Sequence, residues 1–359
     1  MAHSMTAPVT RDGRVLPLDN PYTLSRLRKR HPARVWQRFK HHLGFETPKP
    51  QYGIIIGFRS DYRYSIPVRI ARTLAPFLVP ERTDVPWYSP ASRNDMIHSQ
   101  LFRDYMKRQG HETETKMAEE IDRIDHIRER AWQLGTYPCI GRFWFIRSIF
   151  ATTPYYAQIL DRVKDGAVLL DLACGMGQEL RRLREDGAKG KMYAMDIEKK
   201  MWRLGLELFR DAKNPPAEFV HSTATGRGRE KTMKHFATRI DIILMCQFLD
   251  LFSWYSQEFF LTMLMSISKI GTSVTGWTLG TTRYEAGEYK YEESRGERFL
   301  HCPLTFKILW ENVAQRTNTK WRIESSLLEL VDLGFESDDF SRIKAPKLRA
   351  LCFHATREI

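Results

Sequence analysis

Residues 168–180 constrain this chain most, because they predict a buried strand that runs into a glycine turn and then into a helix. The strand is apolar up to Asp171, and Gly175 and Gly177 follow with one residue between them. Glycine lets a backbone turn sharply and approach a ligand closely. The pattern therefore predicts a ligand site at the carboxyl end of a strand in an α/β fold.

Two kinds of nucleotide cofactor use such a turn, and both allow a second acidic residue at the spacing of Asp196. A dinucleotide site wants a third glycine where this chain has Leu180, and it does not want a carboxylate four residues before the first glycine. Asp171 is that carboxylate, suited to organising the turn and to holding the ammonium of a methionine moiety directly or through water. We therefore expect S-adenosylmethionine (SAM) rather than a dinucleotide; a purely structural turn is the third alternative.

Polar residues at the ends of the next two strands extend the expected cofactor site. Asp196 ends the second strand, where a carboxylate can accept both ribose hydroxyls, or can cap the helix that follows. After the third strand, Ser222 or Thr223 stands where many proteins of this kind place an Asp against the adenine amino group. The predicted cofactor contacts are Asp171, Ala173, Cys174, Gly175, Gly177, Gln178, Asp196, Ile197, Ser222, Thr223, Gln247 and Phe248.

The fourth strand ends at the place where a methyl group would be transferred, and Gln247, Phe248 and Asp250 are the candidates there. Phe248 fits ordinary core equally well, whereas Gln247 and Asp250 are less comfortable when buried without partners. Methyltransferases that act on nucleic-acid bases commonly carry an Asn/Asp-Pro-Pro-aromatic turn at this point. This chain has no proline here, which disfavours a nucleobase as the substrate.

From Ala167 onward, strands and helices alternate. This pattern predicts right-handed βαβ units and an α/β, Rossmann-like, doubly wound sheet of seven strands with helices on both faces. The predicted strands are residues 168–172, 191–195, 218–220, 240–245 and 271–277, followed by a closing antiparallel pair at 321–323 and 348–354. The predicted helices are residues 94–108, 114–132, 155–163, 178–185, 201–209 and 256–269.

The first 110 residues are expected to form a basic, partly helical extension, and residues 111–359 the cofactor-binding domain. The chain carries a formal charge of +13, and its first fifty residues hold ten Lys/Arg against three Asp/Glu. A polyanion contact, a targeting segment and a solvated arm all fit this charge. The solvated arm is favoured, because stacking aromatics are not interleaved with the basic residues.

The five cysteines are odd in number and widely spread, so neither a disulfide framework nor a zinc site is indicated, and no metal is expected. No run reaches the roughly 18 to 20 apolar residues that a membrane span needs. We expect a cytoplasmic protein.

The chain resembles the fungal class I methyltransferases of meroterpenoid and related secondary-metabolite pathways over about residues 112–359. The matching pieces are residues 127–132, 137–141, 156–163, 169–183, 202–211, 248–254 and 301–310. The resemblance implies SAM as cofactor, S-adenosylhomocysteine (SAH) as product, and methyl transfer to an oxygen, typically a carboxylate of a polycyclic intermediate. The family often has His where this chain has Asp250.

A carboxylate is already charged, so its methylation depends mostly on alignment. Arg142 beside Trp144 is a candidate clamp for such an acceptor, with Tyr137 and Trp254 as apolar walls. Arg142 and Trp144 fit surface packing equally well. His301 could act as a base toward a phenol, although a single His is more often structural.

Two other functions remain open at this point. The basic N-terminus would suit an RNA methyltransferase, whose RNA binding should depend steeply on salt. A SAM-binding regulatory protein without catalysis is the other alternative. The sequence leaves a homodimer open.

Overall fold

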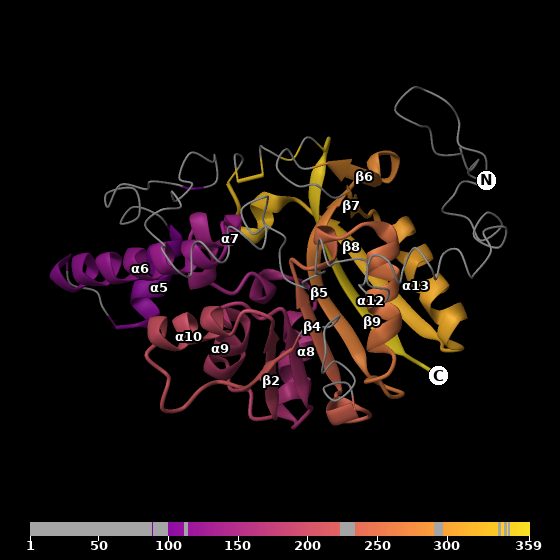
Figure 1. Ribbon diagram of the computed structural model, residues 1–359, viewed down its shortest axis with the longest axis horizontal. Helices are drawn as coiled ribbons and strands as arrows, with labels where there is room; N and C mark the ends of the chain where they lie inside the picture. The colour runs from indigo at the N-terminus through magenta and orange to yellow at the C-terminus, as the bar shows by residue number, and fades with distance from the viewer. Residues whose placement is uncertain are drawn as a thin grey trace, which may run out of the picture.

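We describe a computed structural model of the chain, which covers Tyr88 and residues 100–110, 114–222, 234–290, 297–336, 339–340, 343 and 345–359. Figure 1 shows the arrangement of its elements. The helices are α5 (Gln100–Arg108), α6 (Glu114–Leu134), α7 (Pro138–Gly141), α8 (Tyr156–Lys164), α9 (Gln178–Glu185), α10 (Lys199–Leu208), α12 (Trp254–Leu264) and α13 (Pro303–Thr317). The strands are β1 (Leu169–Leu172), β2 (Met192–Asp196), β3 (Glu218–His221), β4 (Ile242–Cys246), β5 (Ser273–Thr281), β6 (Gly287–Lys290), β7 (Glu297–Leu300), β8 (Trp321–Leu328) and β9 (Leu348–Arg357). Short 3-10 helices include η3 (Trp144–Ile146), η4 (Phe150–Thr152), η5 (Leu249–Leu251), η6 (Arg283–Glu285) and η7 (Leu330–Leu333).

The main sheet has seven strands in the order β3-β2-β1-β4-β5-β9-β8. The first five are parallel, and β9 runs antiparallel between β5 and β8. The order reverses direction next to β1, so the carboxyl ends of β1 and β4 border the crevice where ligands of such sheets bind. This is the class I methyltransferase arrangement, and it confirms the predicted fold.

Alternate residues of the strands face two different helical layers. In β4, Ile243 and Met245 pack in the cluster that holds α12 and α13, whereas Ile242 and Leu244 pack in the cluster that holds α8 and α9. All four are buried, as expected for a parallel strand covered on both faces. In Figure 1, α12 and α13 lie toward the right, and α9 and α10 toward the left.

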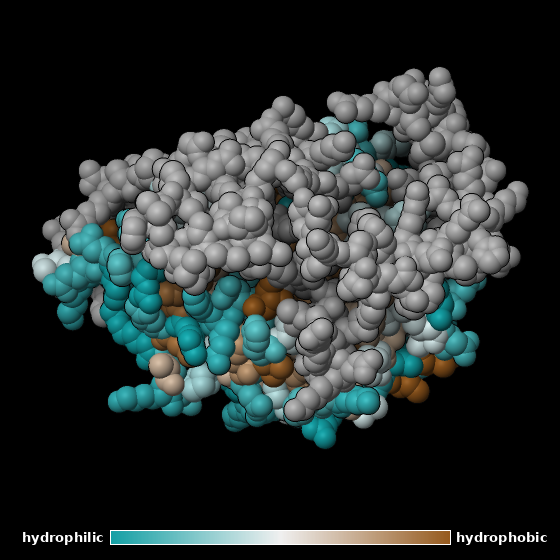
Figure 2. Space-filling view, viewed as in Figure 1, coloured by the Kyte–Doolittle hydropathy of each residue, from teal (hydrophilic) through white to brown (hydrophobic). Residues whose placement is uncertain are grey.

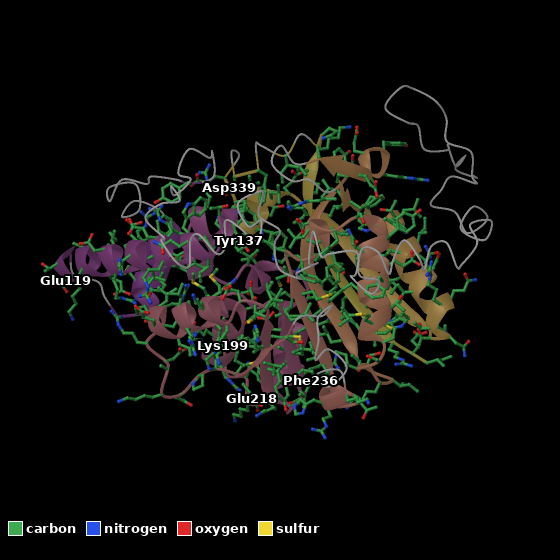
Figure 3. All side chains as sticks on the ribbon, viewed as in Figure 1. Glu119, Tyr137, Lys199, Glu218, Phe236 and Asp339 are labelled. Carbon is green, nitrogen blue, oxygen red and sulfur yellow. The ribbon has the colours of Figure 1, made fainter. Side chains whose placement is uncertain are left out.

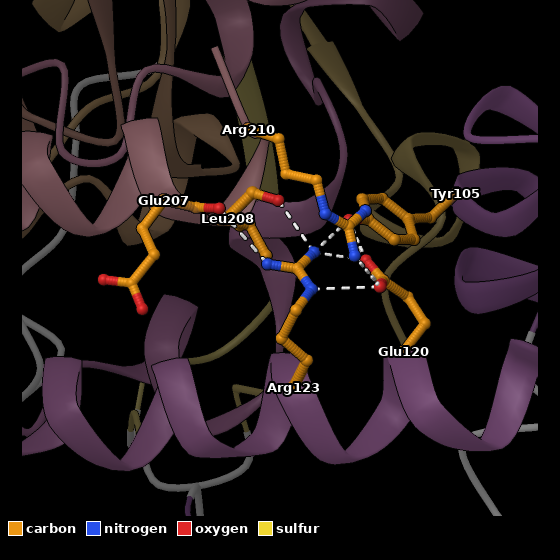
Figure 4. A network of polar contacts seen from close by, with 6 residues as sticks. All are labelled: Tyr105, Glu120, Arg123, Glu207, Leu208 and Arg210. Carbon is orange, nitrogen blue, oxygen red and sulfur yellow. Dashed lines mark hydrogen bonds and ion pairs between the residues drawn. The ribbon is translucent and has the colours of Figure 1, made fainter. Parts of the chain in front are cut away.

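The N-terminal helices α5 and α6 are joined to α10 by the polar network shown in Figure 4. The carboxylate of Glu120, which is 3% exposed, accepts hydrogen bonds from Tyr105 Oη at 2.9 Å and from Arg210 at 2.7 Å. Arg123 donates to the same carboxylate and also to the Leu208 carbonyl, at 2.8 Å. The network therefore fixes these N-terminal helices on the end of α10. We call the described residues from α5 to Phe150 the cover.

Several elements differ in length from the sequence prediction, and two of these differences have a local cause. The helix predicted to reach residue 269 ends at Leu264, because Ser266 and Ser268 donate to the carbonyls of Met263 and Met265 and so compete with helical hydrogen bonds. The strand predicted at 321–323 continues to Leu328. Its polar residues are tolerated since β8 is an edge strand and is only half-buried beyond Ile323.

The sequence analysis did not predict α13 or the β6–β7 hairpin. The signal for α13 was nevertheless present, because its buried residues Phe306, Leu309, Trp310 and Val313 recur at the spacing of one helix face. The hairpin is a separate two-stranded sheet. Of the predicted helix at 94–108, the described part is α5; the basic run at 26–40 lies outside the described residues.

The described surface on the side seen in Figure 2 is mostly hydrophilic, with smaller hydrophobic patches between. Within the residues described, every helix is too short or too polar to span a lipid bilayer. The five cysteines all belong to the described part of the chain, and each is a free thiol.

Candidate active site

The glycine turn between β1 and α9 is anchored to the end of β2. The Cys174 N–H donates to the Met195 carbonyl at 3.1 Å, and the Gly177 N–H closes the turn on the Cys174 carbonyl at 2.8 Å. Gly175 is left-handed, with φ of 55°, and a side chain starting there would meet no heavy atom within 4 Å. The turn therefore leaves an open cradle above the carboxyl end of β1.

Asp171 lies next to this cradle on β1 and is 2% exposed. Its Oδ2 atom has no hydrogen-bond partner within the described residues. Burial, together with the carboxylates of Glu179 and Asp196, raises the pKa of Asp171 well above its usual value. A buried carboxylate oxygen without a partner costs free energy, so the site is suited to receive a positively charged group.

Asp196, at the end of β2, holds the turn from the other side. Its Oδ2 accepts from the Gly175 N–H at 2.9 Å, and its Oδ1 accepts from the Glu198 N–H at 2.8 Å. The N-cap of α10 is Glu198, whose side chain accepts from the Lys200 N–H, and not Asp196. The backbone N–H of Ser222 donates to the Asp196 carbonyl at 3.2 Å, which brings the end of β3 beside the end of β2.

The rest of the predicted cofactor set divides into two groups. Ala173, Gln178 and Ile197 lie with the turn and the end of β2, and Thr223 lies outside the described residues. Phe248 is 1% exposed, and its ring packs against Phe252 and Phe260 in the core.

Gln247 follows β4 in a left-handed conformation, with φ of 50°. Its N–H donates to the carbonyl of Trp277 on β5 at 2.8 Å. A left-handed residue without glycine's freedom costs free energy and persists where the surrounding structure fixes it, often at functional sites. Gln247 is thus held at the junction of β4 and β5, next to the glycine turn on β1.

Asp250 lies in η5 and is buried against Thr278 of β5. The Thr278 hydroxyl donates to Asp250 Oδ1 at 2.6 Å, and it accepts from the Asp250 N–H at 2.9 Å. Burial raises the pKa of Asp250, while the Thr278 hydrogen bond lowers it. The two residues form a closed pair that fixes η5 on the sheet.

His301 is completely buried, and both of its ring nitrogens are engaged. Nε2 lies 2.8 Å from Gln257 Oε1, and Nδ1 lies 3.1 Å from Thr305 Oγ1. Burial lowers the pKa of His301 to about 3, so the ring stays neutral. Trp254 packs on the same ring and is 1% exposed. These surroundings are those of a core histidine, and they do not bring His301 or Trp254 to the glycine turn.

Of the predicted acceptor residues in the cover, Figure 3 labels Tyr137, which lies near Asp339 in that view. Tyr137 is the N-cap residue of α7, and Arg142 is its C-cap. Arg142 Nε lies 3.6 Å from Asp339 Oδ1, so this arginine pairs with the loop between η7 and β9. Trp144 is buried against Phe335 of the same loop, with ring centroids 4.7 Å apart.

Three residues of the site were not singled out from the sequence. Glu179, in the first turn of α9, accepts from the backbone N–H groups of Ile149 and Phe150 and from the Ser148 hydroxyl, so it ties the cover to the glycine turn. Its place two residues after Gly177 was the available signal. Trp277 was visible only as a predicted strand residue. Arg147, like Arg142, flanks the aromatic run of the cover, and only the fold separates their surroundings.

Comparison with known proteins gives the family. The N-terminal domain model of the meroterpenoid methyltransferases matches residues 101–146. The chain is 30% identical over 249 residues to the O-methyltransferase atr3 of Stereocaulon alpinum, covering 68% of this chain and 69% of that protein. The protein belongs to the fungal secondary-metabolite methyltransferases. It is also 30% identical to the methyltransferase ausD of Aspergillus calidoustus, covering 57% of this chain and 74% of ausD.

This methyltransferase uses SAM, in agreement with its family and its strand order. Among solved structures, it is similar to a SAM-dependent methyltransferase from Methanosarcina mazei, at 14% identity and a TM-score of 0.40 over 57% of this chain and 98% of that one. The fold assignment depends on the strand order and not on this likeness. The resemblance that the sequence motifs indicated is confirmed.

Proposed function

We propose that this methyltransferase transfers the methyl group of SAM to a carboxylate oxygen of a small, largely apolar acid, giving a methyl ester. Transfer to oxygen is supported by the relative named as an O-methyltransferase. The cytoplasm is the proposed location, and the five free thiols support a reducing compartment.

The cofactor residues are proposed from the site itself, and the observation that carries them is the unpartnered Oδ2 of buried Asp171. Asp171 would hold the methionine ammonium, and the backbone at Gly175 and Gly177 would lie against the cofactor. The cradle is open at Gly175, whereas a side chain at Gly177 would meet Trp202. Asp196 would accept the ribose hydroxyls. Its oxygens accept hydrogen bonds from the backbone N–H groups of Gly175 and Glu198, and a carboxylate has about four lone-pair sites, so acceptor capacity remains for a hydroxyl.

The acceptor chemistry follows from what the site offers. SAM supplies a methyl group on positively charged sulfur, so the carboxylate oxygen forms the C–O bond, the S–CH₃ electron pair returns to sulfur, and no proton is released. Positioning therefore suffices without a general base. His301 would be a poor base, because burial lowers its pKa to about 3 and both of its ring nitrogens have partners, which supports a reaction of this kind over one that needs a phenol to be deprotonated.

Gln247 and Asp250 remain proposed active-site residues, and we propose a different role for each. The left-handed Gln247 would present its backbone and amide to the bound groups, because its N–H is held on Trp277. Asp250 would act as a positioning residue through Thr278, since its carboxylate is buried against that hydroxyl.

The test is calorimetric titration of the protein with SAH, followed by transfer from methyl-labelled SAM to panels of apolar carboxylic acids, phenols and RNA. Micromolar SAH binding and a base-labile label on an acid would support the proposal. A label on a phenol or on RNA would replace the acceptor, and SAH binding without transfer to any panel would indicate a regulatory SAM-binding protein.

A further inference from the structure

Two buried hydrogen-bond donors near the active site have no acceptor. In the part of the chain that the structure describes, Nε of Arg147 and Nε1 of Trp277 are inaccessible to solvent and lack a hydrogen-bond partner. Leaving a buried N–H unpaired costs about 1–3 kcal/mol. Donors of this kind are explained when a ligand supplies the missing acceptor.

Both donors face one aromatic cluster, formed by Trp144, Trp277, Phe335 and Phe340. The guanidinium carbon of Arg147 lies 5.2 Å from the Phe335 ring centroid, and the Trp277 ring lies 5.4 Å from the same centroid. Both unpaired donors therefore belong to residues that lie beside the ring of Phe335. The cluster combines the cover, β5 and the loop after η7, so it forms only in the folded chain.

The aromatic cluster is connected directly to the cofactor side of the site. Trp277 accepts the N–H of Gln247 through its carbonyl, and Trp277 pairs with Cys246 at the end of β4. Arg147 precedes the Ser148–Phe150 segment that Glu179 holds beside the glycine turn. β5 lies two strands from β1, or about 10 Å across the sheet. This is the distance at which a small acceptor can contact both the cluster and a group bound on the turn.

Arg147 and Arg142 differ in their ion-pair partners. Arg142 is paired with Asp339, which is itself buried and accepts a further hydrogen bond from the Glu336 N–H. Arg147 interacts electrostatically with four carboxylates, those of Asp339, Glu179, Asp104 and Glu336. None of these described residues forms an ion pair or a hydrogen bond with it. Each of the first two is already held by other donors. Of these two arginines, Arg147 is thus the one whose guanidinium has no ion-pair partner among the described residues.

The backbone of Gly334 explains why the guanidinium is fixed. A side chain at Gly334, whose φ is 76°, would start 2.3 Å from an Arg147 terminal nitrogen. The left-handed glycine therefore lets the loop after η7 close on the arginine. This close approach holds Arg147 between that loop and the cover.

We infer that Arg147 binds the carboxylate of the methyl acceptor, with the indole N–H of Trp277 as a second donor and the Phe335 ring against the acceptor's apolar body. This inference rests on the proposed function and names its acceptor-binding residues. The acceptor class is a monocarboxylic acid on a rigid apolar body. A neutral ester of the same body lacks the charge that Arg147 recognises, so product should bind more weakly than substrate.

The experiment measures binding, with SAH present at saturation, of a panel of one-, two- and three-ring carboxylic acids that includes 1-naphthoic and abietic acids, and of their methyl esters. The proteins are wild type, Arg147→Gln, Trp277→Phe and Arg142→Gln. Arg130→Gln serves as the matched control, because Arg130 is an exposed arginine of α6 that pairs with Glu207. SAH affinity is measured for each protein as the readout of fold and cofactor binding.

We expect at least one acid to bind wild type more tightly than its ester. Arg147→Gln should reduce the affinity for that acid about tenfold or more, as expected for the loss of a hydrogen bond to a charged group. The affinities for the ester and for SAH should stay within twofold of wild type. Trp277→Phe should reduce the affinity for the acid severalfold, because it removes the indole N–H while it keeps an aromatic ring at this position. Arg130→Gln should change nothing.

The inference would be overturned if Arg147→Gln left the acid affinity unchanged or reduced the affinities for acid and ester equally. It would also be overturned if only Arg142→Gln reduced the acid affinity. The absence of acid binding by wild type across the panel while SAH still binds would overturn it as well. If wild type does not bind SAH, the proposed function itself fails, and that result is distinguishable from all the others.

Discussion

The carboxylate of Glu179 accepts a hydrogen bond from the backbone N–H of Ile149 at 3.2 Å, so the first turn of α9 holds the segment that leads out of the cover. Burial raises the pKa of Glu179 to about 7, although hydrogen bonds from Ser148, Phe150 and Ile149 lower it. The glycine turn and the cover therefore share one buried carboxyl group, and its protonation bears on both.

This carboxyl should make the free energy of unfolding depend on pH. An acid whose pKa is higher in the folded than in the unfolded state binds its proton more tightly when folded, so its contribution is greatest below about pH 4.5 and is lost as pH rises through 7. Glu179→Gln should remove this slope, measured by urea unfolding at intervals from pH 5 to 8. The exposed Glu185 of the same helix provides the control, and an identical slope in Glu179→Gln would contradict the assignment.

Asp171→Asn should weaken SAH binding about tenfold or more and at the same time stabilise the unliganded protein. The amide cannot attract the methionine ammonium, but it removes a buried charge that has no partner on Oδ2. Calorimetry gives the affinity, and thermal unfolding without ligand gives the stability. Unchanged affinity would remove Asp171 from the cofactor site.

The raised pKa of Asp171 adds a second measurement on the wild type. The free carboxyl holds its proton to higher pH than usual, and a bound ammonium should lower its pKa, so SAH binding should release a proton and tighten as pH rises. Titrations in buffers of different ionisation enthalpy count that proton. Proton uptake, or no exchange in wild type, would be inconsistent with the role.

Asp196→Ala should weaken SAH binding by one to two orders of magnitude, about 1.5–3 kcal/mol for a hydrogen bond to a charged group, while the protein stays folded. The loss combines the ribose contact with the Gly175 N–H that Asp196 holds at 2.9 Å. Glu198→Ala removes the neighbouring N-cap of α10 and serves as the matched control. If both variants bind SAH equally well, Asp196 has no part in cofactor binding.

Glu120→Ala should destabilise the joint between the cover and α10 by about 1–3 kcal/mol, because it removes the carboxylate that Arg123 and Arg210 share, although both arginines are partly exposed. Urea unfolding measures the loss, and limited proteolysis shows whether the cover opens first. The exposed neighbour Glu119, labelled in Figure 3, is the control, and Glu119→Ala should cost less than about 0.5 kcal/mol. Equal stability of the two variants would show that the network does not hold the cover.

Glu120 should also make the stability of the protein depend on pH under acidic conditions. Burial raises the pKa of Glu120, but the hydrogen bonds from Arg123, Arg210 and Tyr105 outweigh it and lower the pKa to about 2. Its contribution to stability is therefore present above about pH 4.5 and is lost as pH falls toward 2. The free energy of unfolding should therefore fall more steeply with decreasing pH in wild type than in Glu120→Gln within that window, and the difference between the two proteins should be constant above it.

Local patterns along the chain determined the sheet and the glycine turn. Apolar runs bounded by turns predicted the positions of all seven strands of the main sheet, most plainly where a buried parallel strand such as β4 needs continuous apolar residues. Asp171 and Asp196 were found by their spacing from Gly175 and Gly177. The assigned division at residue 110 stays a prediction, as do the acceptor's identity and a homodimer.

Only the tertiary structure decided which polar side chains are free to act. Arg142 and Arg147 look equivalent in sequence, yet Asp339, almost two hundred residues later, pairs with one and leaves the other without an ion pair in the described chain. His301 has the residue type of a base, but Gln257 and Thr305 occupy both of its nitrogens in the core. Burial and partnership depend on residues brought together from distant parts of the chain, so no local pattern contains them.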